Sequence, residues 1–164
     1  MSIADILAGA NFSFEKRFGQ NFITDKNLLA AIVDEAGVTG GTVLEIGAGA
    51  GTLTAALAAK ADKIVFFMGL DEVSEAEGID RMDMKIPANQ REMLSLLYTL
   101  DKPVVVVLCC GSSVELQSTD SAAAIVHAYL SGQAGARAIL GVLAGKVNPS
   151  GKLAETFPLK NSDN

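Results

Sequence analysis

Hydrophobic and polar residues follow one another along this 164-residue chain in blocks typical of alternating strands and helices. Short runs rich in Val, Ile and Leu predict buried strands, whereas apolar residues three or four positions apart predict helices with one buried face. The predicted strands span 42–46, 64–68, 104–108, 123–129 and 153–157. The predicted helices span 2–9, 26–36, 52–60, 88–99 and 133–144.

The alternation of strands and helices predicts an α/β fold with one domain over residues 1–164. We expect a three-layer α/β/α sandwich, Rossmann-like or flavodoxin-like, with four to five mainly parallel strands. Two strand orders stay open. In the order 2-1-3-4 the strand at 64–68 lies outside the first strand, whereas in the order 1-2-3-4 it lies beside the strand at 104–108.

Charge and composition exclude several classes of partner. The net charge of −6 and the pI of about 4.7 argue against nucleic acid as a partner. No apolar run approaches the ~20 residues that cross a bilayer, so no membrane partner is expected. The first ten residues lack the basic region of a signal peptide. Cys109 and Cys110 are adjacent, which does not fit a disulfide framework and favours a cytoplasmic location.

Outside the glycine-rich turn at 47–51 and the acidic loop around 75–81, the sequence offers few candidates for chemistry. His127 is the single histidine, and we expect it to be a strand residue with a polar partner. No nucleophile motif accompanies it, so a catalytic triad is not supported. No metal site is expected.

A glycine-rich turn joins a predicted strand to a predicted helix at residues 47–51, with the sequence Gly-Ala-Gly-Ala-Gly. Glycines allow a tight turn and close approach of the backbone to a ligand, and the helix N-terminus offers free N–H groups. The pattern therefore fits an anion or nucleotide site. It equally fits a tight strand-to-helix turn with no ligand.

Residues 16–22 (KRFGQNF) and 39–54 (TGGTVLEIGAGAGTLT) resemble the ribosomal RNA adenine dimethyltransferases. The resemblance implies a pocket for S-adenosylmethionine. Met68 stands where that family has an acidic residue for the ribose, and the family's Asn-x-Pro-aromatic motif is absent. Methyl transfer is therefore not expected, no cofactor is required, and weak S-adenosylmethionine binding stays an alternative. The implied contacts are Gln20, Asn21, Glu45, Gly47, Gly49 and Gly51.

Residues 75–81 (EAEGIDR) resemble a loop of glycoside hydrolase family three, in the β-glucosidase group, and the resemblance covers nearly all of 62–158. It implies the α/β-sandwich domain of those enzymes. In that family the sandwich domain supplies the acid/base carboxyl group, for which Glu77 is the best match and Glu75 the runner-up. The nucleophilic aspartate comes from a separate barrel domain, so hydrolysis by this chain alone is not expected. A solvated acidic surface, with a local Asp80–Arg81 salt bridge, is the alternative reading of the loop.

Two resemblances in one chain lead to the interpretation of an engineered chimera. Its methyltransferase-like part would be 1–61, its glycosidase-like part 62–164, and the fusion point would lie within 58–66. Neither part would hold a complete active site, so we expect no catalytic activity. Weak S-adenosylmethionine binding and residual activity of either parent class are the alternatives. An exposed sheet edge or face would allow a homodimer.

Overall fold

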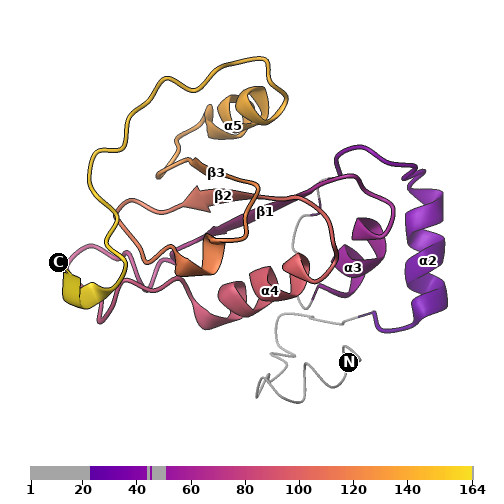
Figure 1. Ribbon diagram of the computed structural model, residues 1–164, viewed down its shortest axis with the longest axis horizontal. Helices are drawn as coiled ribbons and strands as arrows, with labels where there is room; N and C mark the ends of the chain where they lie inside the picture. The colour runs from indigo at the N-terminus through magenta and orange to yellow at the C-terminus, as the bar shows by residue number, and fades with distance from the viewer. Residues whose placement is uncertain (1–22, 44, 46–50, 164) are drawn as a thin grey trace. The chain divides into compact units, whose positions relative to one another are not determined.

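The computed structural model describes residues 23–43, 45 and 51–163, so the predicted helix at 2–9 lies outside the described residues (Figure 1). The chain divides into two compact units. One comprises the residues up to 64 together with 99–102, and the other comprises 65–98 together with 103–164. The expectation of a single domain stays a prediction.

The first unit contains two helices that pack on each other, α2 (Lys26–Glu35) and α3 (Thr52–Ala58). As predicted, Asp25 caps α2, because its Oδ1 accepts a 2.9 Å hydrogen bond from the Asn27 N–H. The apolar stripe of α2 buries Leu29 and Val33. The sequence thus predicted both helices and the residue that begins the first of them.

Residues 44 and 46 of the predicted strand at 42–46 lie outside the described residues, and Thr42 forms an isolated bridge in which it pairs parallel with Lys63. The neighbouring turn is held by Asp62, whose Oδ2 accepts a 2.8 Å hydrogen bond from the Gly41 N–H. Gly41 has a φ of 81°, a conformation that glycine adopts without steric cost. A bridge of one residue pair is too short to count as a strand.

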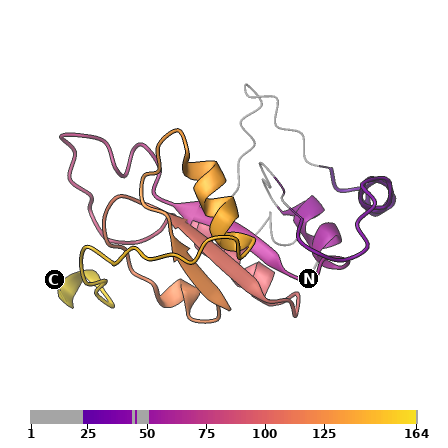
Figure 2. The same ribbon diagram turned by 90° about the horizontal axis from the view of Figure 1, so that it is seen from above.

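The second unit is built on a three-stranded parallel sheet. Helix α4 lies against one face of the sheet and α5 against the other, so this unit has three layers (Figures 1 and 2). The predicted fold class, an α/β sandwich with a parallel sheet, is therefore confirmed. The elements are β1 (Ile64–Gly69), α4 (Ala88–Tyr98), β2 (Val104–Cys109), η2 (Gln117–Thr119), β3 (Ala124–His127), α5 (Gly135–Leu143) and η3 (Asn161–Asp163).

The strands follow the order β1-β2-β3, and β2 pairs with β3 from Val105↔Ala124 to Leu108↔His127. Because β1 neighbours β2, the order 2-1-3-4 is excluded and the pairing agrees with 1-2-3-4. Central strand β2 is covered on both faces, and its Val106 and Val107 are completely buried. A strand buried on both faces reads as a continuous apolar run, which is why the sequence predicted β2 so clearly.

Two sequence expectations about strands are wrong for the described residues. These residues contain three strands, not four to five, and 153–157 forms no strand. In that segment the Ala154 N–H donates a 3.0 Å hydrogen bond to the Tyr129 hydroxyl oxygen. A short apolar run has no intrinsic need to join a sheet, since a side chain can satisfy its backbone instead.

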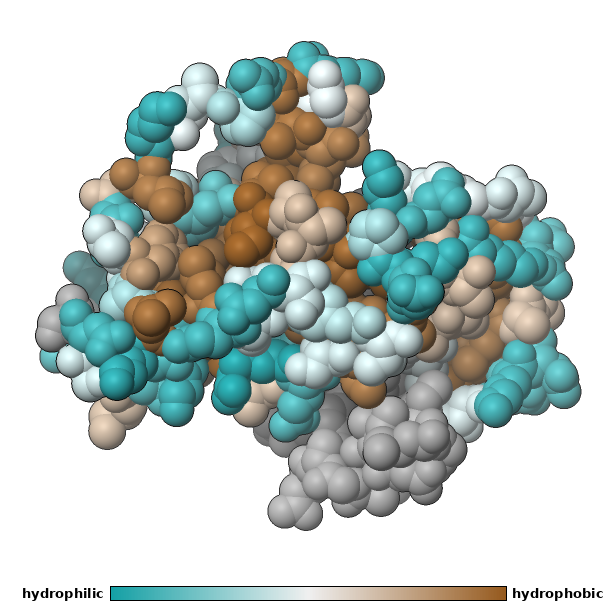
Figure 3. All heavy atoms as spheres, viewed as in Figure 1, coloured by the Kyte–Doolittle hydropathy of each residue, from teal (hydrophilic) through white to brown (hydrophobic). Residues whose placement is uncertain are grey.

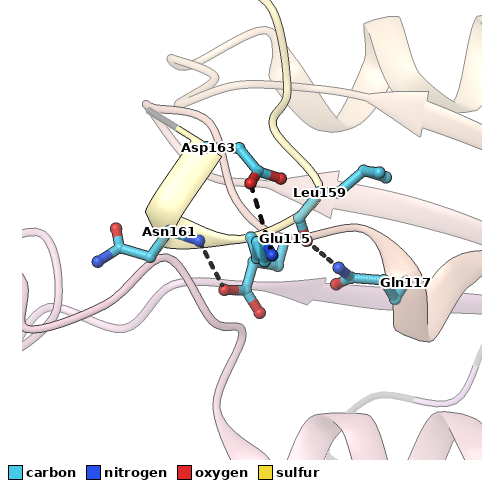
Figure 4. A network of polar contacts seen from close by, with 6 residues as sticks. Glu115, Gln117, Leu159, Asn161 and Asp163 are labelled. Atoms are coloured by element: carbon cyan, nitrogen blue, oxygen red, sulfur yellow. Dashed lines mark hydrogen bonds and ion pairs between the residues drawn. The ribbon is translucent and has the colours of Figure 1, made fainter.

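The last described residues are attached to the segment that follows β2 (Figure 4). The Asn161 N–H donates a 3.1 Å hydrogen bond to Glu115 Oε1, and Gln117 Nε2 donates to the Leu159 carbonyl oxygen. Lys160, directly before η3, forms an ion pair of 3.9 Å with Asp163. These contacts are exposed, so we expect each to contribute little to the free energy of unfolding.

Candidate functional site

The carboxyl ends of β1, β2 and β3 continue into loops at residues 70–86, 110–116 and 128–134. In open α/β sheets, ligand sites lie at this edge, because the loops there are free to vary while the strands hold them in place. The acidic loop at 70–86 is one of these loops. Its position makes it one of the loops of the second unit that can meet a ligand.

Glu75 joins the acidic loop to the loop after β2. Its Oε1 accepts a 2.8 Å hydrogen bond from the backbone N–H of Gly111 and lies 3.4 Å from the Ser112 hydroxyl, which donates to it. A hydrogen bond from an amide to a carboxylate is stronger than one between neutral groups. The carboxylate of Glu75 is thus committed to a structural contact.

Arg81 makes a second connection between the same two loops. Its Nη2 donates a 3.1 Å hydrogen bond to the Ser113 carbonyl oxygen, and Ser113 is buried. The expected salt bridge between Asp80 and Arg81 is not formed, since no ion pair within the described residues includes Arg81. The guanidinium reaches a fixed carbonyl of the neighbouring loop instead of its exposed sequence neighbour.

Glu77 lies between these two connections. Its side chain is exposed, and within the described part of the chain its carboxylate has no hydrogen-bond partner. Gly78 follows with a φ of 80°, so the chain turns sharply directly after Glu77. A carboxylate in this position is free to meet a ligand, whereas that of Glu75 is already engaged.

A buried thiol lies directly before Gly111. Cys110 is completely buried, and desolvation raises the pKa of its thiol to about 11, with the negative charge of Glu75 adding to the effect. Burial also raises the pKa of Cys109. Both cysteines are therefore protonated near neutral pH and poor nucleophiles. The described residues contain no group of three or more His, Cys, Asp or Glu side chains suited to a metal ion.

An apolar cavity of about 660 Å³ lies in the second unit, between α5, β3 and the segment 149–157, and reaches the loop at 128–134. Hydrophobic residues gather between α5 and the sheet in Figure 3. The ring of His127 packs 3.7 Å from that of Tyr129, and its Nδ1 lies 3.3 Å from the Leu108 carbonyl oxygen. His127 is thus a strand residue with a polar partner, as expected. The cavity walls include Ile125, Val126, Ala138, Ile139, Val142, Leu153 and Phe157.

Most residues of the predicted S-adenosylmethionine site, namely Gln20, Asn21, Gly47 and Gly49, lie outside the described residues. Of the other two, Glu45 accepts a hydrogen bond from the Thr54 hydroxyl, and Gly51 precedes α3 with a φ of 71°. The Glu45 contact therefore joins the residue at 45 to α3. None of the described helices is long and apolar enough to cross a membrane.

An α/β sandwich with an acidic loop at the carboxyl edge of its sheet is the class of domain that these observations define. The model of the glycosyl hydrolase family 3 C-terminal domain matches residues 15–164. The chain therefore belongs to this family of C-terminal domains.

Two curated relatives illustrate the similarity. The chain is 47% identical over 107 residues to thermostable beta-glucosidase B of Acetivibrio thermocellus, a match that covers 65% of this chain and 14% of the relative. It is 32% identical over 162 residues to probable beta-glucosidase I of Aspergillus clavatus, a match that covers 98% of this chain and 19% of the relative. The chain thus spans less than a fifth of the length of either relative.

A solved structure supports the same assignment. The Bifidobacterium adolescentis GH3 beta-glucosidase superposes with a TM-score of 0.63 at 33% sequence identity, over 99% of this chain and 22% of that one. The likeness therefore extends along nearly the whole sequence, including the residues before 62.

These matches overturn the interpretation of an engineered chimera. The family model runs without a break across the expected fusion point within 58–66, and a relative aligns over 162 residues. Residues 1–61 are thus not assigned to a methyltransferase, and the expectations of a chimera and of an S-adenosylmethionine module are wrong. The physical reason is that a strand, a glycine turn and a helix form the same local unit in many α/β domains.

Sequence reasoning missed the contacts that organise the acidic loop. Glu75 and Gly111 are 36 positions apart, and Arg81 and Ser113 are 32 apart. A glycine that follows a buried strand was the available signal, because it permits a close approach of the backbone. No periodicity in the sequence relates such distant positions.

Proposed function

We propose that this chain provides the general acid/base of a family 3 glycoside hydrolase that acts on a β-glucoside, and that Glu77 is that residue. One observation carries the choice of Glu77 over Glu75. Glu77 is exposed at the carboxyl edge with a free carboxylate, whereas Glu75 accepts a 2.8 Å hydrogen bond from Gly111. The relatives named as beta-glucosidases support the class of substrate.

The proposed chemistry uses Glu77 twice. In the first step, the Glu77 carboxyl group gives its proton to the glycosidic oxygen while the bond between that oxygen and the anomeric carbon breaks. A second carboxylate forms a bond to the anomeric carbon in the same step. In the second step, the Glu77 carboxylate takes a proton from water, and the water oxygen displaces that second carboxylate.

The second carboxylate is expected to come from a barrel domain, as the family resemblance implies. Two carboxyl groups about 5–5.5 Å apart are needed for this mechanism. We therefore expect the 164-residue chain alone to show no turnover. Activity should require the chain to be joined to the remainder of a family 3 enzyme.

A hybrid enzyme tests the proposal. In Acetivibrio thermocellus beta-glucosidase B, the segment that matches this chain is replaced by the matching residues of this chain, and hydrolysis of aryl β-glucosides is measured. Glu77→Gln should lower kcat for poor leaving groups by about 10²–10⁴-fold, the usual share of general acid catalysis. The reaction of a dinitrophenyl glucoside should be affected less in its first step, because its leaving group needs little protonation.

Azide separates an acid/base residue from a residue that only supports the fold. Azide should restore turnover of Glu77→Ala and give a glucosyl azide, since the small anion attacks the anomeric carbon without base catalysis. Glu72→Gln is the matched control, because Glu72 is an exposed carboxylate on the same loop. Full activity of the Glu77→Gln hybrid would refute the assignment of Glu77.

A further inference from the structure

We propose that Glu75 is a positioning residue, which together with Arg81 holds the segment that carries Glu77. The inference rests on the proposed function for its catalytic meaning. Its structural part stands independently, on contacts between two loops of the second unit. It assigns the two carboxylates of one short segment to different tasks.

The segment 75–81 is attached to the loop after β2 near both of its ends. Glu75 contacts Gly111 and Ser112, and Arg81 contacts Ser113, so the three partners are consecutive residues. Only five residues separate the two attached side chains. A short segment fixed at both ends has few conformations, and Glu77 lies within it.

The loop after β2 is a rigid base for these contacts. Cys110 and Val114, which flank the three partners, are completely buried. Cys110 directly follows the central strand β2, whose side chains are covered on both faces. Close packing on both sides leaves such a segment little freedom to move. Contacts to this segment therefore hold the acidic loop in a fixed position.

The residue that donates to Glu75 is a glycine with two close neighbours. A Cβ atom on Gly111 would lie 2.9 Å from Leu130 Cδ1 and 3.4 Å from Glu75 Oε1. A methyl group at this position would displace the exposed Leu130 side chain and would touch the Glu75 carboxylate at ordinary contact distance. The Glu75 carboxylate approaches the Gly111 backbone to 2.8 Å.

The geometry gives three substitutions of Glu75 different outcomes. Glu75→Gln keeps an oxygen acceptor at the same reach, so the Gly111 contact should persist. Glu75→Asp keeps the charge but shortens the side chain by one methylene, so the contact should be lost. Glu75→Ala removes the acceptor entirely. Glu75→Gln is the variant expected to disturb the fold least, because it keeps the contact and buries no unpaired charge.

The first measurement uses the 164-residue chain and needs no activity. Amide hydrogen exchange of Gly111, followed by NMR, should be slow in the wild type and in Glu75→Gln. It should be at least about tenfold faster in Glu75→Asp and Glu75→Ala, because the amide loses its acceptor. Glu72→Ala is the control and should leave the exchange of Gly111 unchanged. Equal exchange in the wild type and Glu75→Asp would overturn the contact.

The second measurement uses the hybrid glucosidase. Glu75→Asp should lower kcat by about 10²-fold with KM nearly unchanged, since misplacing a catalytic group by about 1 Å has that effect. Glu75→Gln should stay within about fivefold of the wild type, the difference between a charged and a neutral acceptor. Azide should not rescue Glu75→Asp, because the Glu77 carboxylate is still present.

The outcomes separate this inference from the proposed function. Azide rescue of Glu75→Ala, or a loss of activity in Glu75→Gln as large as that in Glu77→Gln, would make Glu75 the acid/base and overturn its positioning role. Normal activity of Glu77→Gln would refute the proposed function alone. In that case the hydrogen exchange of Gly111 would still decide whether Glu75 fixes the loop.

Discussion

Gly69 and Cys109, the last residues of the neighbouring strands β1 and β2, lie so close that a Cβ atom on Gly69 would be 1.7 Å from the Cys109 carbonyl oxygen. The Gly69 N–H donates a 2.8 Å hydrogen bond to Gln90 Oε1 of α4. A glycine at the end of β1 therefore lets the two strands approach directly before the site loops begin. This contact fixes where the loops at 70–86 and 110–116 start.

Gly69→Ala should destabilise the second unit by about 3 kcal/mol, because backbone atoms must move to admit the methyl group. The free energy of unfolding from a denaturant titration measures the loss. Gly132→Ala is the matched control, since a Cβ atom on Gly132 meets nothing within 4 Å. A loss no larger than that of the control would show that the strands separate easily at this point.

The buried thiol of Cys110 should make stability depend on pH in the alkaline range. Its pKa is about 11 in the folded chain against an ordinary value of 9.0. The unfolded chain therefore releases this proton first as the pH rises. The contribution to the free energy of unfolding is complete below about pH 9 and is lost as the pH rises from 9 towards 11.

Cys110→Ala tests that dependence. Denaturant titrations between pH 7.5 and 10.5 should show a smaller loss of stability with pH in Cys110→Ala than in the wild type. Lysine and tyrosine groups titrate in both proteins, so the difference between the two slopes isolates the thiol. Identical slopes would mean that the Cys110 thiolate is as well solvated in the folded chain as in the unfolded chain.

Asp25→Ala should destabilise α2 by about 1 kcal/mol, because the Asn27 and Leu28 N–H groups lose the carboxylate that caps them. Hydrogen exchange of amides along α2 is the direct measurement. Asp25→Asn should retain most of the stability, since asparagine is an equally good cap. Asp34→Asn, at the other end of the helix, should not change the protection of the first turn.

Phe157→Ala should destabilise the second unit by about 2 kcal/mol, which is less than for a completely buried Phe. The Phe157 ring meets the edge of His127 with centroids 5.3 Å apart and forms part of the cavity wall between α5 and β3. Thermal unfolding and limited proteolysis of the segment 149–158 would both report the loss. Leu159→Ala is the control, because the Leu159 side chain is 72% exposed and makes few contacts.

Local patterns in the sequence were sufficient for the helices and the strong strands. α2, α4 and β2 appear within one or two residues of their predicted bounds, because their apolar spacing and caps are local properties. The candidate strand at 153–157 was wrong, because a strand needs a partner and this segment finds a tyrosine hydroxyl instead. The glycine-rich turn at 47–51 led to the wrong prediction of a methyltransferase part, because the same pattern occurs in unrelated α/β domains.

The sequence by itself determined the α/β class, the acidic loop and two candidate carboxylates, Glu75 and Glu77. Spacing and polarity along the chain are enough for such statements. Only the tertiary structure decided the strand order and the different surroundings of the two carboxylates. Glu75 meets the Gly111 amide 36 positions away, while Glu77 stays exposed. Contacts between distant positions depend on how the strands pair, and no local pattern of residues encodes that pairing.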